Sequence, residues 1–354
     1  MEQGIGKQCA AAELEQPAQH RFRLLDASGR FEQLRVLTSE NVWDLRELPR
    51  RLAVLGGGPI GCELAQAFVR LGARVTIIDA APRILANDDA DAAEVVAAAL
   101  RREGVEILTD ARIDSVREGG AGKTIRLTRG GESSGITASH LLVAAGRAPN
   151  VEGLGLEEAG VEFEKEGIAV DERMRTSNPH VYAIGDVASR FQFTHAADAQ
   201  ARMVVRNALF FGRGKAGDLV IPWCTYTSPE LAHVGIAPDE VAQAGDEVET
   251  ITIPMADVDR ARTDGTTEGF FRVHLKAGSD TILGATLVAE HAGDIISQVT
   301  QAMTAGTGLG KLGETIFPYP TSAEVLRKAA DAWRRGRLTP TAKRAFGLFF
   351  RARG

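Results

Sequence analysis

Three glycines at fixed spacing carry the clearest chemical signal in the sequence. Gly56, Gly58 and Gly61 follow an apolar run at 52–55 and precede a pattern of helical period at 62–71. In this arrangement the first glycine permits a tight turn, the second lets the main chain approach a pyrophosphate, and the third lets the helix pack against the strand. The N–H groups at the start of the helix, aligned with its dipole, can then bind phosphate oxygens. The spacing therefore predicts a dinucleotide-binding site.

An acidic residue stands where such a site holds ribose. The β-branched run at 75–78 ends at Asp79, whose carboxylate could accept hydrogen bonds from both ribose hydroxyls. A 2′-phosphate would meet a like charge there, so Asp79 favours NAD over NADP, although Arg83 could soften that preference. The alternative is a tight strand-to-helix turn that binds no ligand. The residues that we expect to contact the dinucleotide are Gly56, Gly57, Gly58, Pro59, Ile60, Gly61, Asp79 and Ile113.

The surrounding sequence supplies the elements that would position these groups. Short apolar runs alternate with helical patterns, which predicts a parallel sheet covered by helices. The expected strands lie at 52–55, 75–78, 105–108 and 141–144, and the expected helices at 62–71 and 88–104. Glycines at 119, 120 and 122 indicate a hairpin between further strands at 113–116 and 124–127. We assign residues 50–148 to an NAD(P)-binding Rossmann-like domain.

Composition narrows the function classes. A chain of 354 residues with 44% hydrophobic and 25% charged residues is long enough for two or three globular domains. A net charge of −6 argues against a general nucleic-acid binder. No apolar run approaches the roughly 18 residues of a membrane span, and the first twenty residues contain no signal-peptide apolar core. The three cysteines are far apart and lack metal-site spacing, so we expect no metal site and a reducing, cytoplasmic location.

Three separate motifs resemble one enzyme family. They are GGGPIGCELAQAF from residue 56, AAGRAPN from residue 144 and VYAIGDVA from residue 181. In this order they resemble the pyridine-nucleotide–disulfide oxidoreductases, which include dihydrolipoamide dehydrogenase and mercuric reductase. The segments TSENVWDLRELP, FTHAADAQARMVVRNALF and IPWCTYTSPELAHVG are most similar to mercuric-reductase-like members. The resemblance implies an α/β, Rossmann-like two-dinucleotide-binding flavoprotein fold with a truncated FAD domain and an α+β interface or dimerisation domain. It also implies the cofactors NAD(P) and FAD, and a homodimer.

The resemblance divides the chain into five expected parts. They are an N-terminal remnant and linker at 1–49, the NAD(P)-binding domain at 50–148, a second segment of the FAD-binding domain at 149–217, an interface domain at 218–335 and a basic tail at 336–354. Within the interface domain we expect strands at 248–254, 269–276 and 282–288 and helices at 292–305 and 321–335. The tail mixes basic and aromatic residues and could touch a membrane surface. The alternative for the tail is a frayed helix or an oligomer contact.

The resemblance also assigns residues to a flavin site. Asp186, after Gly185 and at the end of an expected strand, would bind the ribityl hydroxyls, and Gly146 and Arg147 belong to the motif before it. Thr194 and His195 precede an expected helix at 196–209, whose first N–H groups face the flavin pyrimidine ring in similar proteins. Read without the family, Asp186 is a helix cap and His195 a solvated loop histidine.

Two departures from the family concern its redox chemistry. The family begins with its own glycine motif for FAD and a CxxxxC redox pair, and these 354 residues contain neither. Cys9 has no cysteine five residues on, and we expect Cys62 and Cys224 to be structural thiols. Glu63 corresponds to a glutamate that pairs, in similar proteins, with a lysine of that first segment. These 354 residues do not contain that segment, so the resemblance assigns Glu63 no lysine partner within them.

The third departure lies near the carboxyl end. The family often carries a His–Glu pair there as an acid–base group. Phe317 stands at the histidine position, and Glu324 remains as the candidate catalytic carboxylate, although it could simply be a helix-start acid.

These observations predict an oxidoreductase that passes hydride from NAD(P)H to flavin without a working redox disulfide. One alternative is a non-catalytic, NAD-binding and dimerising remnant. The other is one half of a split flavoenzyme whose FAD segment is a separate chain.

Overall fold

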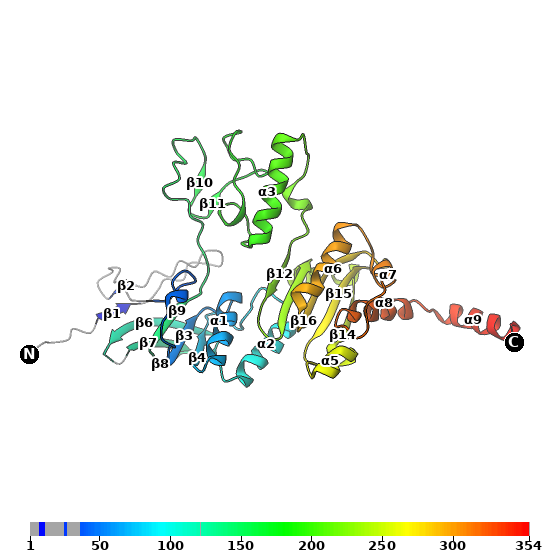
Figure 1. The fold of residues 1–354 in the computed structure, drawn as a ribbon, viewed down its shortest axis with the longest axis horizontal. Helices are drawn as coiled ribbons and strands as arrows, with labels where there is room; N and C mark the ends of the chain where they lie inside the picture. Colours follow the sequence, from blue (N-terminus) through cyan, green and yellow to red (C-terminus); the bar gives the residue numbers. More distant parts are fainter. Residues whose placement is uncertain (1–6, 11–24, 27–35, 121, 354) are drawn as a thin grey trace, which may run out of the picture. The chain divides into compact units, whose positions relative to one another are not determined.

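The chain divides into two compact units in the computed structural model, residues 1–221 and 222–354. The structure describes residues 7–10, 25–26, 36–120 and 122–353 (Figure 1). Near the amino end, β1 (Lys7–Ala10) pairs antiparallel with β2 (Leu25–Asp26), and a 3₁₀ turn, η1, spans Val42–Asp44.

A four-stranded parallel sheet forms the first layer of the amino-terminal unit. Its order is β5-β4-β3-β9, from β5 (Glu106–Leu108), β4 (Arg74–Ile78), β3 (Arg51–Leu55) and β9 (His140–Val143). The crossover helices are α1 (Pro59–Arg70) and α2 (Ala90–Arg102). This arrangement confirms the expected Rossmann-like strands and helices. Helix α1 begins three residues earlier than expected, because proline suits the first turn of a helix.

A second, antiparallel sheet belongs to the same unit. It contains β6 (Ala111–Gly119), β7 (Gly122–Arg129) and β8 (Glu132–Ala138), with β1 beside β6. The glycine hairpin between β6 and β7 is confirmed. Strand β8 was not expected, because its sequence ESSGITA is polar and its side chains are mostly exposed. Apolar side chains of β6 and β7 share one core with β3 and β9, which fixes the second sheet against the first.

The segment after β9 has little regular structure before its one long helix. It contains β10 (Phe163–Glu164), β11 (Gly167–Ile168), the 3₁₀ turns η2 (Gly185–Val187) and η3 (Ala216–Asp218), and α3 (Thr194–Leu209). The sequence led us to expect a strand ending at Asp186, and this was wrong. Gly185 has a φ of +68°, and the chain turns into η2 there instead. A Cβ on Gly185 would lie 3.0 Å from the Cβ of Ala197, so the turn suits glycine.

The carboxyl-terminal unit is an antiparallel sheet with helices. The strand order is β12-β13-β16-β15-β14, from β12 (Pro222–Thr225), β13 (Glu230–Gly235), β14 (Val248–Pro254), β15 (Phe270–Lys276) and β16 (Ile282–Ala289). The three expected strands are confirmed, and β12 and β13 were missed. The shorter helices are α4 (Pro238–Ala244), η4 (Gly245–Glu247), η5 (Met255–Asp257), α5 (Asp259–Asp264) and α7 (Leu309–Leu312). The longer helices are α6 (Ala292–Thr304), α8 (Glu324–Gly336) and α9 (Pro340–Ala352). Across the described residues, no helix combines the length and apolar character needed to cross a bilayer.

Candidate dinucleotide site

Two of the motif glycines are required by close packing. Gly56 has a φ of +101°, and a Cβ there would lie 2.5 Å from the carbonyl oxygen of Ala144. A Cβ on Gly61 would collide with the carbonyl oxygen of Gly56. The loop after β3 is therefore held between the start of α1 and the segment that follows β9. This brings the glycine motif and the AAGRAPN motif together at the carboxyl ends of two parallel strands.

Gly58 differs from its neighbours because it faces open space. A Cβ at Gly58 would have no heavy atom of the described residues within 4 Å, and its φ of −74° is open to any residue. Packing within this chain therefore does not explain a glycine at this position. Gly58 is the N-cap of α1, so the helix N–H groups that lack intrahelical partners lie next to this space. The cradle fits a pyrophosphate, which needs close main-chain approach and helix-start donors.

The carboxylate of Asp79 is fixed by the main chain. It directly follows β4, and its two oxygens accept hydrogen bonds from the N–H groups of Gly57, at 2.5 Å, and Ala81, at 2.7 Å. A carboxylate offers about four acceptor positions, so two bonds leave room for ribose hydroxyls. The half-buried Asp79 therefore supports the glycine loop and could also bind ribose.

The Arg83 side chain forms hydrogen bonds within its own loop. Its guanidinium donates to the carbonyl oxygens of Leu85, Ala86 and Asp88 at 2.5–2.7 Å. These three bonds order the loop that follows Asp79. They also oppose the expectation that Arg83 could soften the preference for NAD, because a 2′-phosphate would have to displace them.

The Cys62 thiol lies behind the glycine loop. It is fully buried, and its Sγ is 3.3 Å from the carbonyl oxygen of Gly57. Burial, followed by the negative charges of Asp79 and Glu63, raises the pKa of Cys62 far above that of an ordinary thiol. A thiol of this kind stays protonated, which agrees with the structural role expected of Cys62.

The remaining residues of the first motif differ in exposure. Pro59 is exposed and Ile60 is half-buried in the first turn of α1, and Glu63 follows on the same turn, also half-buried. Ile113 is 8% exposed and packs in the core between the two sheets. Its side chain is thus occupied by packing, and only its main chain could reach a ligand.

An ion pair joins the second motif to the third. A guanidinium nitrogen of Arg147 lies 3.3 Å from a carboxylate oxygen of Asp186, and the same guanidinium donates to the carbonyl of Gln192. Gly146, beside Arg147, has a φ of +110°, a conformation that favours glycine. Both charged side chains remain nearly half exposed, at 43% and 46%, so the pair can still contact a ligand.

Sequence reasoning missed Gln200, which positions the turn at Gly185. Its buried side-chain oxygen accepts from the N–H of Gly185 at 2.8 Å, and its amide donates to Ser189 Oγ at 3.1 Å. The available signal was a glutamine on the otherwise small-residue face of the expected helix. Thr194 and His195 form the exposed first turn of α3, where the His195 ring stacks on Phe193 at 5.3 Å.

The candidate catalytic carboxylate belongs to the carboxyl-terminal unit. Glu324 is the first residue of α8 and is 7% exposed; one oxygen contacts Arg327, and Lys328 lies 3.9 Å from it. Its other oxygen, Oε2, is buried without a hydrogen-bond partner among the described residues. Phe317 is half-buried and Tyr319 is exposed, with its hydroxyl 3.2 Å from Asp259. No group of metal-ligating side chains was found in the described part of the chain.

Comparison with known proteins assigns the family. Residues 18–201 match the family model described as pyridine nucleotide-disulphide oxidoreductase, and residues 221–330 match its dimerisation domain. The chain belongs to the pyridine nucleotide-disulphide oxidoreductase family. Its members use FAD and NAD(P)H, so the family assignment agrees with the dinucleotide chemistry expected from the motifs.

Named relatives lie on both expected branches. The chain is 38% identical over 303 residues to a dihydrolipoyl dehydrogenase of Thermus scotoductus, covering 83% of this chain and 65% of the relative. It is 37% identical over 294 residues to a mercuric reductase of Bacillus cereus, covering 83% and 47%. The chain thus spans roughly half to two thirds of the length of these relatives.

Solved structures share the fold. The Cu(II) complex of the HOCl-induced flavoprotein disulfide reductase RclA from Escherichia coli matches with a TM-score of 0.77 and 30% identity, over 84% of this chain and 67% of that one. LpdA from Mycobacterium tuberculosis matches with a TM-score of 0.78 and 28% identity, over 92% and 68%. The Rossmann-like flavoenzyme fold with a dimerisation domain is therefore established.

Proposed function

We propose that the chain binds NADH and serves a flavin-dependent oxidoreductase, and that these 354 residues alone do not reduce a disulfide acceptor. The observation that carries the proposal is the cradle at Gly58, an open space next to the start of α1 and to a fixed Asp79. A strand-to-helix turn that binds no ligand would need Gly56 and Gly61 for packing. It would not need glycine at position 58, where a Cβ would contact no described residue.

The residues of this chain have distinct roles in the proposed site. The N–H groups of Ile60 and Gly61 bind the pyrophosphate, and the Asp79 carboxylate accepts from ribose hydroxyls. Asp186, held by Arg147, binds ribityl hydroxyls of FAD, and the first turn of α3 places N–H groups beside the flavin ring. Bound FAD would accept hydride from NADH and pass electrons to an acceptor.

The thiol chemistry of the family has no counterpart in the residues of this polypeptide. A dithiol relay needs two neighbouring thiols, one of them as a reactive thiolate. Cys62 is buried with a raised pKa, and Cys224 lies in β12 of the other unit. Because flavin can pass electrons directly to a small acceptor such as a quinone, we propose that these residues alone support quinone reduction and not disulfide reduction.

The test is an anaerobic titration of the purified polypeptide with FAD and then NADH. NADH binding followed by loss of the flavin absorbance at 450 nm, and turnover with a quinone, supports the proposal. Rapid reduction of a disulfide substrate in a Cys9→Ser variant would overturn the claim about the acceptor. Failure to bind NADH would overturn the site itself.

A non-catalytic, NADH-binding and dimerising protein is the second candidate. It is favoured by Phe317, which cannot transfer a proton at the position where the family often has a histidine. This candidate predicts NADH binding without any flavin reduction, whichever acceptor is supplied. The same titration therefore separates the two.

We also propose that the chain is a homodimer through its dimerisation domain. Large apolar side chains remain exposed there, with Ile316 at 94%, Tyr319 at 74% and Tyr226 at 66%. Two other aromatic residues of this domain, Trp223 and Phe317, are half-buried, so they would contribute less to a contact. Light scattering at micromolar concentration should give twice the 37.8 kDa chain mass, and a monomer mass would refute the proposal.

A further inference from the structure

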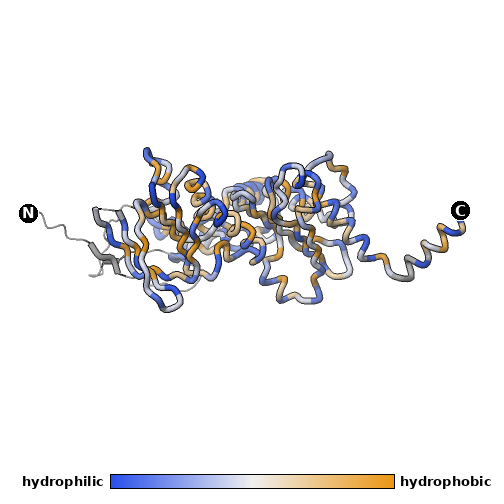
Figure 2. Tube along the Cα trace, turned by 90° about the horizontal axis from the view of Figure 1, so that it is seen from below, coloured by the Kyte–Doolittle hydropathy of each residue, from blue (hydrophilic) through white to orange (hydrophobic). Residues whose placement is uncertain are grey.

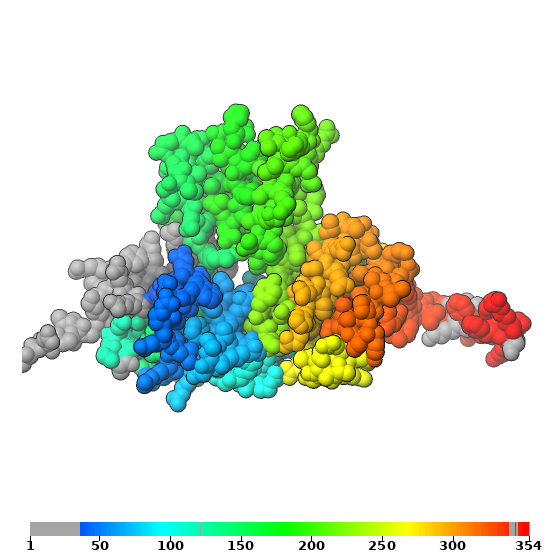
Figure 3. Space-filling view, viewed as in Figure 1, coloured from blue at the N-terminus to red at the C-terminus, as the bar shows by residue number. Residues whose placement is uncertain are grey.

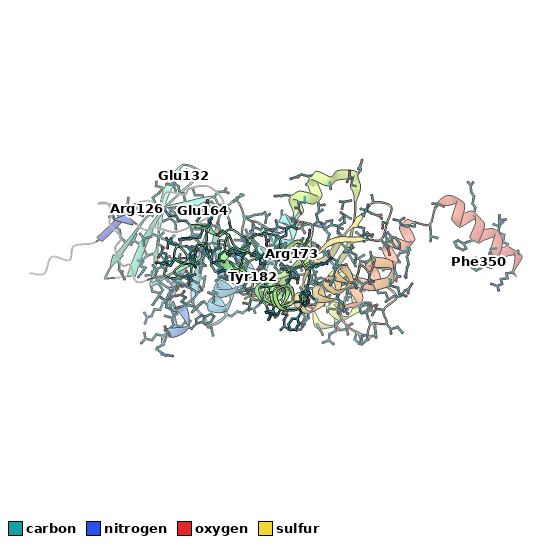
Figure 4. The ribbon with its side chains drawn as sticks, turned by 90° about the horizontal axis from the view of Figure 1, so that it is seen from above. Arg126, Glu132, Glu164, Arg173, Tyr182 and Phe350 are labelled. Atoms are coloured by element: carbon teal, nitrogen blue, oxygen red, sulfur yellow. The ribbon has the colours of Figure 1, made fainter. Side chains whose placement is uncertain are left out.

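Helix α9 presents apolar side chains that are exposed among the described residues. Phe346 and Phe349 are each 52% exposed, Phe350 is 66% exposed and Leu348 is 68% exposed. Their described ring contacts are with one another, Phe346 with Phe350 at 6.4 Å and Phe349 with Phe350 at 5.5 Å, and with Arg353. Figure 4 shows Phe350 on this helix, and Figure 3 draws its surface in red. Neighbouring apolar side chains that are exposed together in this way indicate an interaction site.

Helix α9 places Arg344 and Arg351 on the side opposite its phenylalanines. At about 100° per residue, the three phenylalanines cover an arc of roughly 100°, and Arg344 and Arg351 lie within roughly 20° of each other on the opposite side. Apolar and polar positions alternate along this part of the chain in Figure 2. The result is an aromatic face opposite two arginines, with Leu348 on the arginine side.

The charge of this segment is opposite to that of the protein. Residues 336–354 contain five basic residues and no acidic one, in a chain of net charge −6. At its start, Arg337 is held within the unit, over the Trp333 ring and 3.6 Å from Glu249. For Arg344 and Arg351, in contrast, no ion pair is found with any residue that the structure describes.

We propose that α9 binds the surface of an anionic lipid membrane, with its phenylalanines in the headgroup region and its arginines on lipid phosphates. Charge complementarity decides between this occupant and a second copy of the chain. Two copies of residues 336–354 would bring together ten basic residues and no acid, whereas an anionic bilayer supplies the missing negative charge. A basic helix with an aromatic face is the pattern that lies in a membrane interface.

The test is co-sedimentation of the full chain with vesicles, either of phosphatidylcholine alone or with 30% phosphatidylserine. We expect binding to the anionic vesicles, weakening as salt is raised from about 0.05 to 0.5 M, and little binding to the neutral ones. Arg344→Gln/Arg351→Gln should bind about 30-fold more weakly, since each basic residue near an anionic surface contributes roughly fivefold. Phe349→Ser/Phe350→Ser should lose binding to both vesicle types.

Matched control variants remove arginine or phenylalanine side chains outside α9. Arg46→Gln/Arg50→Gln takes two positive charges from exposed positions, and Phe211→Ser takes a phenylalanine that is 97% exposed; both should bind like wild type. Circular dichroism and NADH binding should be unchanged in every variant, because α9 is not part of the proposed dinucleotide site. Absence of binding to anionic vesicles, or equal loss in the controls, would overturn the proposal. So would self-association that depends on α9 without any vesicle binding, which would identify a second copy as the occupant.

Discussion

Gly58→Ala and Gly61→Ala should affect different properties, although the two residues are only three positions apart in one motif. A Cβ on Gly61 collides with the main-chain oxygen of Gly56, while a Cβ on Gly58 meets nothing within 4 Å. Gly61→Ala should therefore damage folding of the amino-terminal unit. Gly58→Ala should leave folding intact and damage only the binding of NADH.

The expected magnitudes follow from these contacts. Overpacking costs about 1–3 kcal/mol, and the clash at Gly61 is with backbone, which cannot rotate away, so we expect about 3 kcal/mol. In a unit of this size that lowers Tm by roughly 6–12 °C. At Gly58, alanine is a poorer N-cap by about 0.5–1 kcal/mol, but the stiffer unfolded chain offsets this by about 0.4–1 kcal/mol. Loss of one hydrogen bond to a charged phosphate should weaken NADH binding on the order of 10- to 100-fold.

The assay combines calorimetric titration with NADH and thermal unfolding of the same three proteins. Each variant is the other's control, since both add one methyl group to the same motif. Equal NADH affinity in wild type and Gly58→Ala would refute the reasoning, because the open space would then not be the pyrophosphate cradle. An unchanged Tm in Gly61→Ala would refute the packing argument for α1.

Three more outcomes test the sites. Asp79→Asn, which keeps an acceptor for the Gly57 N–H, should narrow the difference between the NADH and NADPH dissociation constants; an unchanged ratio would exclude Asp79 from ribose recognition. In a Cys9→Ser background, the half-buried Cys224 should react with a thiol reagent, while Cys62 should react only after unfolding. The hydrogen bond and negative charge of Asp259 raise the pKa of Tyr319, so Asp259→Asn should shift its absorbance titration at 295 nm to lower pH, with Tyr319→Phe identifying the transition.

Periodicity predicted the parts of the fold that are buried on both faces. Strands β3, β4 and β9 appear in the sequence as continuous apolar runs, because helices and a second sheet exclude water from both sides. Strand β8 escaped prediction because its polar sequence carries no such signal. The strand expected before Asp186 failed for a different reason, since the turn at Gly185 lies against Ala197, twelve residues away.

Site residues were predictable where one residue type is chemically required. Gly58 and Asp79 follow from what a pyrophosphate and a ribose need, so their spacing carries the information. Hydrogen bonds from side chains to distant or neighbouring main chain leave no such pattern in the sequence. The three bonds that hold Arg83 in its own loop, and the buried amide of Gln200 under Gly185, depend on folded geometry alone.

The three sequence motifs form a continuous set of contacts within the amino-terminal unit. The glycine loop touches the AAGRAPN motif where Gly56 lies against Ala144, and that motif reaches VYAIGDVA through Arg147 and Asp186. Hydride transfer requires that two bound rings meet within van der Waals contact, so their binding motifs must be positioned by shared backbone rather than by flexible linkers. A residue larger than glycine at position 56 would disturb both neighbouring motifs at once, because its side chain would occupy the junction between β3 and the segment after β9. The geometry of the site therefore depends on the contacts between the motifs at this junction, and not on any single motif alone.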